Sequence, residues 1–231
     1  MKRFGIIIIF LIISLLFDGF ITTLFMGKDI VSELPGKVFF LRRDKQVLNL
    51  YSADANLSNI QLIYSHKGRG EGNENIIDYY YDKASNKVFF IAMKDGEWSL
   101  YSIKPGDQHP HYLRKTKSLS SDDAYIKPET GKIKAIRKEG SIYLSKDGKE
   151  VLLKHYYGIY DSKFAPGYVP LGFSPNGQYL IYSWTDHFTP IGAILELLIH
   201  YELDSLYVMD INIGKTNKYL STGREIQWIM N

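Results

Sequence analysis

The feature that most constrains the fold is an internal repeat that runs through residues 37–231. The sequence KVFF occurs at 37–40 and again at 87–90, and in each copy a tyrosine follows 14 residues after the lysine. Four related units begin 50, 45 and 46 residues apart, at Lys37, Lys87, Lys132 and Gln178. Each unit contains one recurring tyrosine: Tyr51, Tyr101, Tyr143 and Tyr207. A period of this length, built from short strands, is typical of the blades of a β-propeller.

Each unit divides into short segments rich in Tyr, Val, Ile and Phe that are separated by turn residues, a pattern that predicts strands. The first unit lacks its first strand, whereas the chain carries a last strand without a partner at 225–230. Pairing the last strand with the first unit would close a ring and remove exposed sheet edges. We therefore predict an all-β fold over 37–231, a small β-propeller of about four blades closed by the C-terminal strand.

The last unit shows the clearest resemblance to a known repeat. The segments LGFSPNGQYLIY at 171–182 and LYVMDINIGKTNKYL at 206–220 resemble the repeat of TolB-like β-propellers, which is WD40-like. Related repeats form the non-catalytic propeller domains of prolyl-oligopeptidase-type enzymes. The resemblance implies a binding scaffold and implies no chemistry.

The N-terminus reads as a membrane anchor. Residues 4–26 consist mostly of Ile, Leu and Phe, with Asp18 as their one charged residue, which favours insertion into a bilayer. Lys2 and Arg3 precede this span, so we expect a cytoplasmic N-terminus and an extracytoplasmic remainder. The resulting domains are a signal-anchor at 1–27, a linker at 28–36 and the propeller at 37–231. A cleaved secretory signal is the alternative, and it would also export the propeller.

Composition excludes several classes of protein. The chain has no cysteine, which rules out a disulfide scaffold, a thiolate metal site and a cysteine nucleophile. Its 28 basic and 25 acidic residues are too balanced to indicate nucleic-acid binding. His109 and His111 flank Pro110 in a predicted loop and do not form a convincing metal motif. We expect neither a cofactor nor a metal.

Long connections cluster on one predicted face of the propeller. They are residues 65–75, residues 155–167, and a connection at 185–204 that contains a predicted helical insertion at 188–203, with Thr189 as its N-cap. Loops on a rigid scaffold often carry function, and tyrosine gives a loop large, stiff contact area. The candidate binding residues are Tyr156, Tyr157, Tyr160, Trp184, His187, Ile194 and Leu198.

These observations favour a membrane-anchored extracytoplasmic propeller that binds a protein or peptide and performs no catalysis. One alternative is a hydrolase of cell-wall glycan or peptide that would use the carboxylates of Asp122, Asp123 and Asp186. Another is a structural surface protein in which two anchored chains form a homodimer through the predicted helix.

Overall fold

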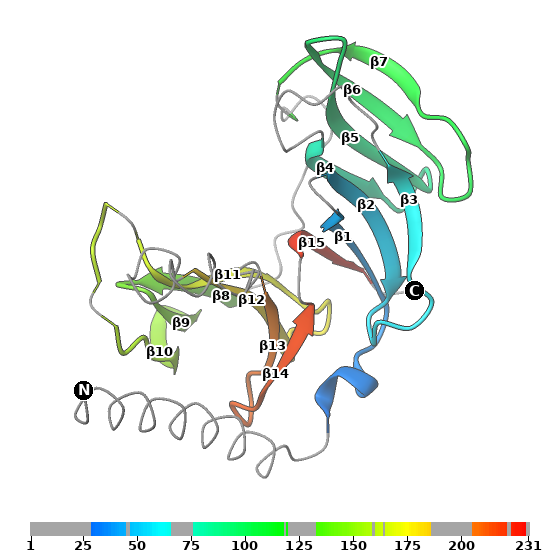
Figure 1. The fold of residues 1–231 in the computed structure, drawn as a ribbon. Helices are drawn as coiled ribbons and strands as arrows, with labels where there is room; N and C mark the ends of the chain where they lie inside the picture. The colour runs from blue at the N-terminus through cyan, green and yellow to red at the C-terminus, as the bar shows by residue number, and fades with distance from the viewer. Residues whose placement is uncertain are drawn as a thin grey trace, which may run out of the picture. The chain divides into compact units, whose positions relative to one another are not determined.

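A computed structural model describes residues 29–44, 47–65, 76–117, 119, 133–158, 160–163, 165–185, 205–220 and 223–229. These residues form an all-β fold of four antiparallel sheets and contain no α-helix (Figure 1). One turn of 3-10 helix, Ile30–Glu33, precedes the first strand, within the stretch predicted as a linker. All the strands belong to the second of two compact units of the chain, Val31–Asn231.

The sheets follow the predicted units. The first sheet has the order β15 (Arg224–Ile229), β1 (Lys37–Asp44), β2 (Val47–Asp54) and β3 (Gln61–Ser65). The second has β4 (Ile76–Asp82), β5 (Lys87–Lys94), β6 (Glu97–Ile103) and β7 (His111–Lys115). The third has β8 (Ile133–Lys138), β9 (Ser141–Lys146) and β10 (Lys149–Lys154). The fourth has β11 (Gly167–Phe173), β12 (Tyr179–Thr185), β13 (Leu206–Asp210) and β14 (Thr216–Leu220).

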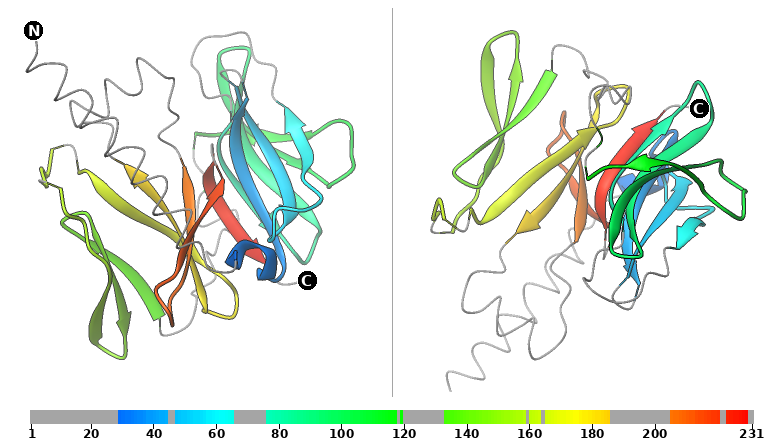
Figure 2. Two further views of the ribbon diagram at one scale, coloured as in Figure 1. Left: turned by 60° about the horizontal axis from the view of Figure 1, so that its bottom comes forward. Right: turned by 90° about the horizontal axis from the view of Figure 1, so that it is seen from above.

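The predicted role of the last strand is confirmed at the level of strand pairing. β15 runs antiparallel to β1, with Val38 opposite Trp228 and Phe40 opposite Ile226. The two strands lie side by side in Figures 1 and 2, although they come from opposite ends of the described chain. The C-terminal strand therefore supplies the first strand of the first sheet.

The recurring tyrosine has the same pairing position in every sheet. Its partner on the preceding strand is Phe40, Phe90, Ile136 or Tyr182, and the three aromatic partners stack on it with ring centroids 5.5–5.7 Å apart. Such pairs each contribute about 0.5–1.5 kcal/mol beyond simple burial. A shift of register toward the following strand also recurs at this tyrosine in all four sheets. The repeat in the sequence is thus a repeat of pairing and of β-bulges.

The face that carries the recurring tyrosine packs against a neighbouring sheet in two clusters. In the first, Phe90 and Tyr101 of the second sheet are buried together with Leu50 of the first sheet. In the other, Tyr182 of the fourth sheet is buried with Ile142 of the third.

The first sheet follows the same rule. Alternate residues of a strand share a face, so Val38, its partner Trp228 and the Phe40–Tyr51 pair lie on one side. Trp228 stacks on Tyr179 of the fourth sheet with ring centroids 6.2 Å apart. The first sheet thus contacts the second and the fourth, and the fourth contacts the third.

Closure of the four sheets into a ring is not detected among the described residues. The predicted helix at 188–203 and the predicted membrane span at 4–26 lie outside those residues. Within the part of the chain that the structure describes, no helix is long and apolar enough to cross a membrane.

Candidate functional site

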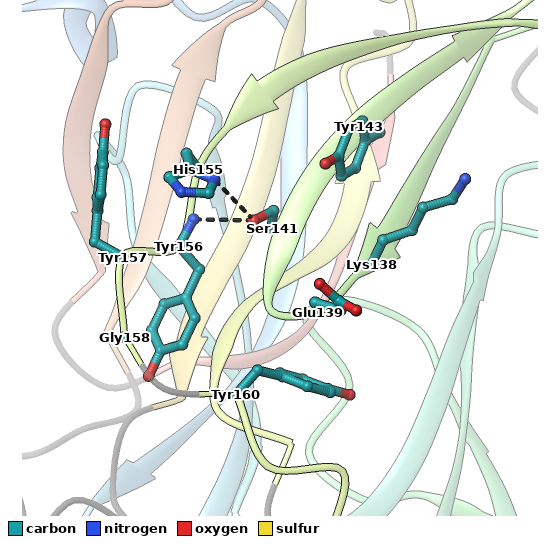
Figure 3. A pocket seen from close by; sticks show the side chains of 9 residues that line it. All are labelled: Lys138, Glu139, Ser141, Tyr143, His155, Tyr156, Tyr157, Gly158 and Tyr160. Carbon is teal, nitrogen blue, oxygen red and sulfur yellow. Dashed lines mark hydrogen bonds between the residues drawn. The ribbon is translucent and has the colours of Figure 1, made fainter.

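A pocket of about 760 Å³ lies at one end of the third sheet. Two segments form it: the β8–β9 turn with its flanking strand ends, and the residues that follow β10. Its lining residues are Lys138, Glu139, Ser141, Tyr143, His155, Tyr156, Tyr157, Gly158 and Tyr160 (Figure 3). Three of the seven residues predicted from sequence, Tyr156, Tyr157 and Tyr160, therefore line one pocket.

Local turn chemistry brings the two segments together. Glu139 and Gly140 have φ angles of 47° and 78°, the two positive values that a tight two-residue hairpin turn requires. A Cβ on Gly140 would lie 2.7 Å from both the Pro166 carbonyl oxygen and Cδ1 of Tyr156. Glycine is therefore needed here both for its backbone conformation and for the close approach of the next segment.

Tyr156 anchors the segment that follows β10. Its side chain is only 8% exposed, and its backbone N–H donates to the Ser141 hydroxyl at 3.0 Å. A Cβ on Gly158 would lie 2.2 Å from the Tyr156 hydroxyl, so this glycine lies directly against the ring. Tyr156 is consequently a support for the pocket wall and offers little surface to a ligand.

Tyr157 and Tyr160 provide the exposed aromatic surface. The Tyr157 side chain is 89% exposed, and its ring meets the His155 ring edge-on with centroids 4.6 Å apart. Tyr160 is 38% exposed. In Figure 3 the side chains of Tyr160 and Tyr143 lie on either side of the Glu139 carboxylate, whereas Tyr157 lies on the far side of His155 and Tyr156. Aromatic side chains with few rotatable bonds bind partners at a low cost in conformational entropy.

The charges at the pocket are unevenly matched. The Lys138 ammonium forms an ion pair with Glu150 at 2.5 Å and lies 5.8 Å from the centre of the Tyr143 ring. Glu139 is exposed and has no ion pair or side-chain hydrogen bond to another described residue. The pocket therefore presents one carboxylate whose charge is not balanced by a described neighbour.

A second cation lies on the other face of the third sheet. Lys154 is half-buried, with its ammonium 4.9 Å from the centre of the Tyr168 ring and 5.5 Å from that of Tyr182. Burial lowers the pKa of the Lys154 ammonium, because desolvation disfavours the charged form. Burial also raises the pKa of the Tyr182 phenol, which therefore stays neutral. This cluster belongs to the contact between the third and fourth sheets.

Ser141 and His155 are positioned for support more than for nucleophilic catalysis. The serine oxygen lies 3.5 Å from His155 Nδ1, longer than a well-formed hydrogen bond between a nucleophile and its base. Ser141 is also 4% exposed, and its oxygen already accepts the Tyr156 N–H. The arrangement suits a binding site with a fixed wall. Among the described residues there is no group of three His, Asp or Glu side chains that could hold a metal.

The remaining predicted residues are not brought to the pocket. Trp184 lies in β12 opposite Tyr168, and its indole N–H is buried without a hydrogen-bond partner among the described residues. His187, Ile194 and Leu198 lie outside the described residues, as do Asp122, Asp123 and Asp186 of the alternative hydrolase. Their proposed roles remain predictions.

Several lining residues were missed by sequence reasoning. Recurrence of a tyrosine in every unit indicates a structural role for Tyr143, yet Tyr143 both pairs with Ile136 and lines the pocket. Glu139 was not among the residues predicted for the site. The Glu-Gly dipeptide signals the turn, but only folding shows that residues 155–160 pack over it.

Comparisons with known proteins add little. No protein-family model and no curated protein matches the sequence. A chain in a crystal structure of a nidogen/laminin complex matches 82% of this chain, at 9% identity and a TM-score of 0.30. The match covers only 63% of the length of that chain. A crystal structure of a protein from Lactobacillus plantarum aligns with 86% of this chain and 68% of its own, at 12% identity and a TM-score of 0.26. At such TM-scores neither likeness bears on function.

Proposed function

We propose that the chain is a membrane-anchored, extracytoplasmic β-propeller of the TolB-like kind that binds a protein or peptide through the pocket of its third sheet. Residues 4–26 would form the anchor, with the N-terminus in the cytoplasm. The function is recognition without catalysis.

The propeller part of the proposal is supported by the repeated packing rule. The recurring-tyrosine faces of the first, second and fourth sheets each pack on another sheet. On the third sheet the corresponding face carries Ile136, Tyr143 and Leu152, which are half-buried or exposed. By the same rule this face would pack on the second sheet, and that contact would close a four-bladed ring. Closure would cover Tyr143, so a partner would contact the pocket at the end of the sheet, through Glu139, Tyr157 and Tyr160.

The binding part rests on one observation: Tyr157 and Tyr160 present exposed rings in a pocket whose wall is held by the buried Tyr156 and Ser141. Exposed aromatic side chains on a rigid wall favour tight binding, because the protein loses little conformational entropy when a partner contacts them. His187, Ile194 and Leu198 remain part of the proposed contact surface on the grounds of sequence.

Site-specific photo-crosslinking in intact membranes tests this function. A photoreactive phenylalanine analogue is placed at Tyr157 of the full chain or, as the matched control, at Tyr112, another tyrosine that is 56% exposed but lies outside the pocket. We expect a protein or peptide adduct at 157 that is absent at 112 and disappears when Tyr160→Ala is added. Equal adducts at both positions, or an adduct insensitive to Tyr160→Ala, would contradict the proposal.

A further inference from the structure

The charge of the pocket indicates what kind of group it can bind. Lys138 is the one lysine or arginine in the lining, and Glu150 already balances its charge at 2.5 Å. Glu139, the next residue along the chain, lines the pocket without a described charge partner. The Nδ1 atom of His155 faces the Ser141 hydroxyl at 3.5 Å. An anionic ligand would find no unmatched lysine or arginine here, whereas a cationic ligand would find an unmatched carboxylate.

The aromatic side chains reinforce this preference. The faces of tyrosine rings carry partial negative charge and attract cations within about 6 Å of the ring centre. The chain already uses its recurring tyrosines in this way, because Arg42 lies 4.1 Å from the centre of the Tyr51 ring and Lys138 lies 5.8 Å from that of Tyr143. Tyr160, which has no such cation among the described residues and lies beside Glu139 in Figure 3, leaves room for one from a partner.

We infer that the pocket binds a basic side chain, arginine or lysine, of an incoming peptide segment, with Glu139 as its charge partner and Tyr160, which lies beside that carboxylate in Figure 3, as its aromatic wall. This inference rests on the proposed function and specifies the partner's chemistry. Arginine fits best, since its planar guanidinium can stack on a tyrosine ring and donate to a carboxylate at the same time.

Peptides that differ only in charge test the inference. The probe is a fluorescent decapeptide in which arginine alternates with glycine and serine, and its reference replaces every arginine by citrulline, which has nearly the same shape and no charge. We expect fluorescence anisotropy with the full chain in detergent to show that the arginine peptide binds about tenfold more tightly than the citrulline peptide. A tenfold difference is about the scale of one charge-assisted contact. The preference should weaken as salt is added, because the contact is partly exposed.

A matched pair of variants isolates Glu139. Glu139→Gln removes the proposed charge partner, and Asp147→Asn removes the same charge from the corresponding turn position in the same sheet, where the φ angle of 50° is nearly the same as the 47° of Glu139. We expect Glu139→Gln to abolish the preference for arginine over citrulline and Asp147→Asn to leave it unchanged.

The outcomes separate this inference from the function on which it rests. Equal binding of both peptides, or equal effects of the two variants, would overturn the role of Glu139, while the crosslink at 157 would still support peptide binding. Tighter binding of a glutamate peptide, or of a neutral glycan oligomer, than of the arginine peptide would show that the pocket binds another class of ligand and would overturn the inference. Absence of the 157 crosslink would overturn the proposed function itself.

Discussion

At the scale of single residues, the pocket depends on glycines that permit close contact between segments. Gly140 and Gly148 both occupy the second position of a two-residue turn in the third sheet, with φ angles of 78° and 77°. Their surroundings differ. A Cβ on Gly148 would meet nothing within 4 Å, whereas one on Gly140 would meet Tyr156 and Pro166 at 2.7 Å.

Alanine at these two positions separates the steric contribution from backbone strain. Both substitutions should cost about 1–2 kcal/mol, because a side chain disfavours positive φ. Gly140→Ala should cost roughly 1–3 kcal/mol more, the usual range for overpacking a filled site. Urea denaturation monitored by tryptophan fluorescence measures the difference in unfolding free energy. Equal losses would mean that Tyr156 moves aside freely and does not brace the pocket.

At the scale of elements, β15 links two sheets through side-chain amide chemistry. The Gln227 side chain accepts from the Tyr81 N–H at 2.7 Å and donates to the Tyr81 carbonyl at 3.0 Å. It thereby satisfies the backbone of β4, the edge strand of the second sheet. The Tyr79 hydroxyl adds contacts of 2.6 Å to the carbonyls of Phe39 and Glu225. An exposed strand edge is covered by these contacts.

Gln227→Ala should therefore destabilise the fold by about 1–3 kcal/mol. The substitution removes two hydrogen bonds and leaves the partly buried N–H and C=O groups of Tyr81 without these partners. Gln61→Ala, at an exposed position of β3 in the same sheet, should change the free energy of unfolding by no more than about 0.5 kcal/mol. Thermal and urea unfolding of both variants provide the test. A Gln227→Ala variant as stable as Gln61→Ala would show that β15 is held by its pairing with β1 alone.

At the scale of the whole molecule, the decisive question is whether the second and third sheets meet. Because the chain has no cysteine, spin labels can be attached at introduced cysteines without background. Labels at the exposed Lys94 and Lys134 report on the proposed contact, and labels at Lys37 and Lys94 report on the contact between the first and second sheets as the control. Pulsed electron paramagnetic resonance measures the distribution of distances between the two labels of each pair. If the ring is closed, the distribution for the first pair should be as narrow as that for the control pair. A broad distribution alongside a narrow control would exclude closure.

The positions of the described strands followed from the sequence because they depend on short-range patterns. Alternating apolar residues and Glu-Gly or Asp-Gly turns define hairpins locally. The recurring tyrosine allowed the four units to be aligned with one another. In that alignment only the first unit lacked a strand, and only the segment at 225–230 lacked a partner. Pairing of β15 with β1 was predictable for that reason.

The site depended on contacts that leave no local pattern. Tyr156, Tyr157 and Tyr160 looked equivalent in sequence, but folding buried the first under the Glu139–Gly140 turn and left Tyr157 exposed. The neutralisation of Lys138 by Glu150 depends on how β8 and β10 lie across β9. The sequence by itself determined the strands, the repeat and the tyrosine-rich segment, since these need only neighbouring residues. Which rings are exposed, and which carboxylate lacks a described partner, was decided by packing between segments distant in the chain.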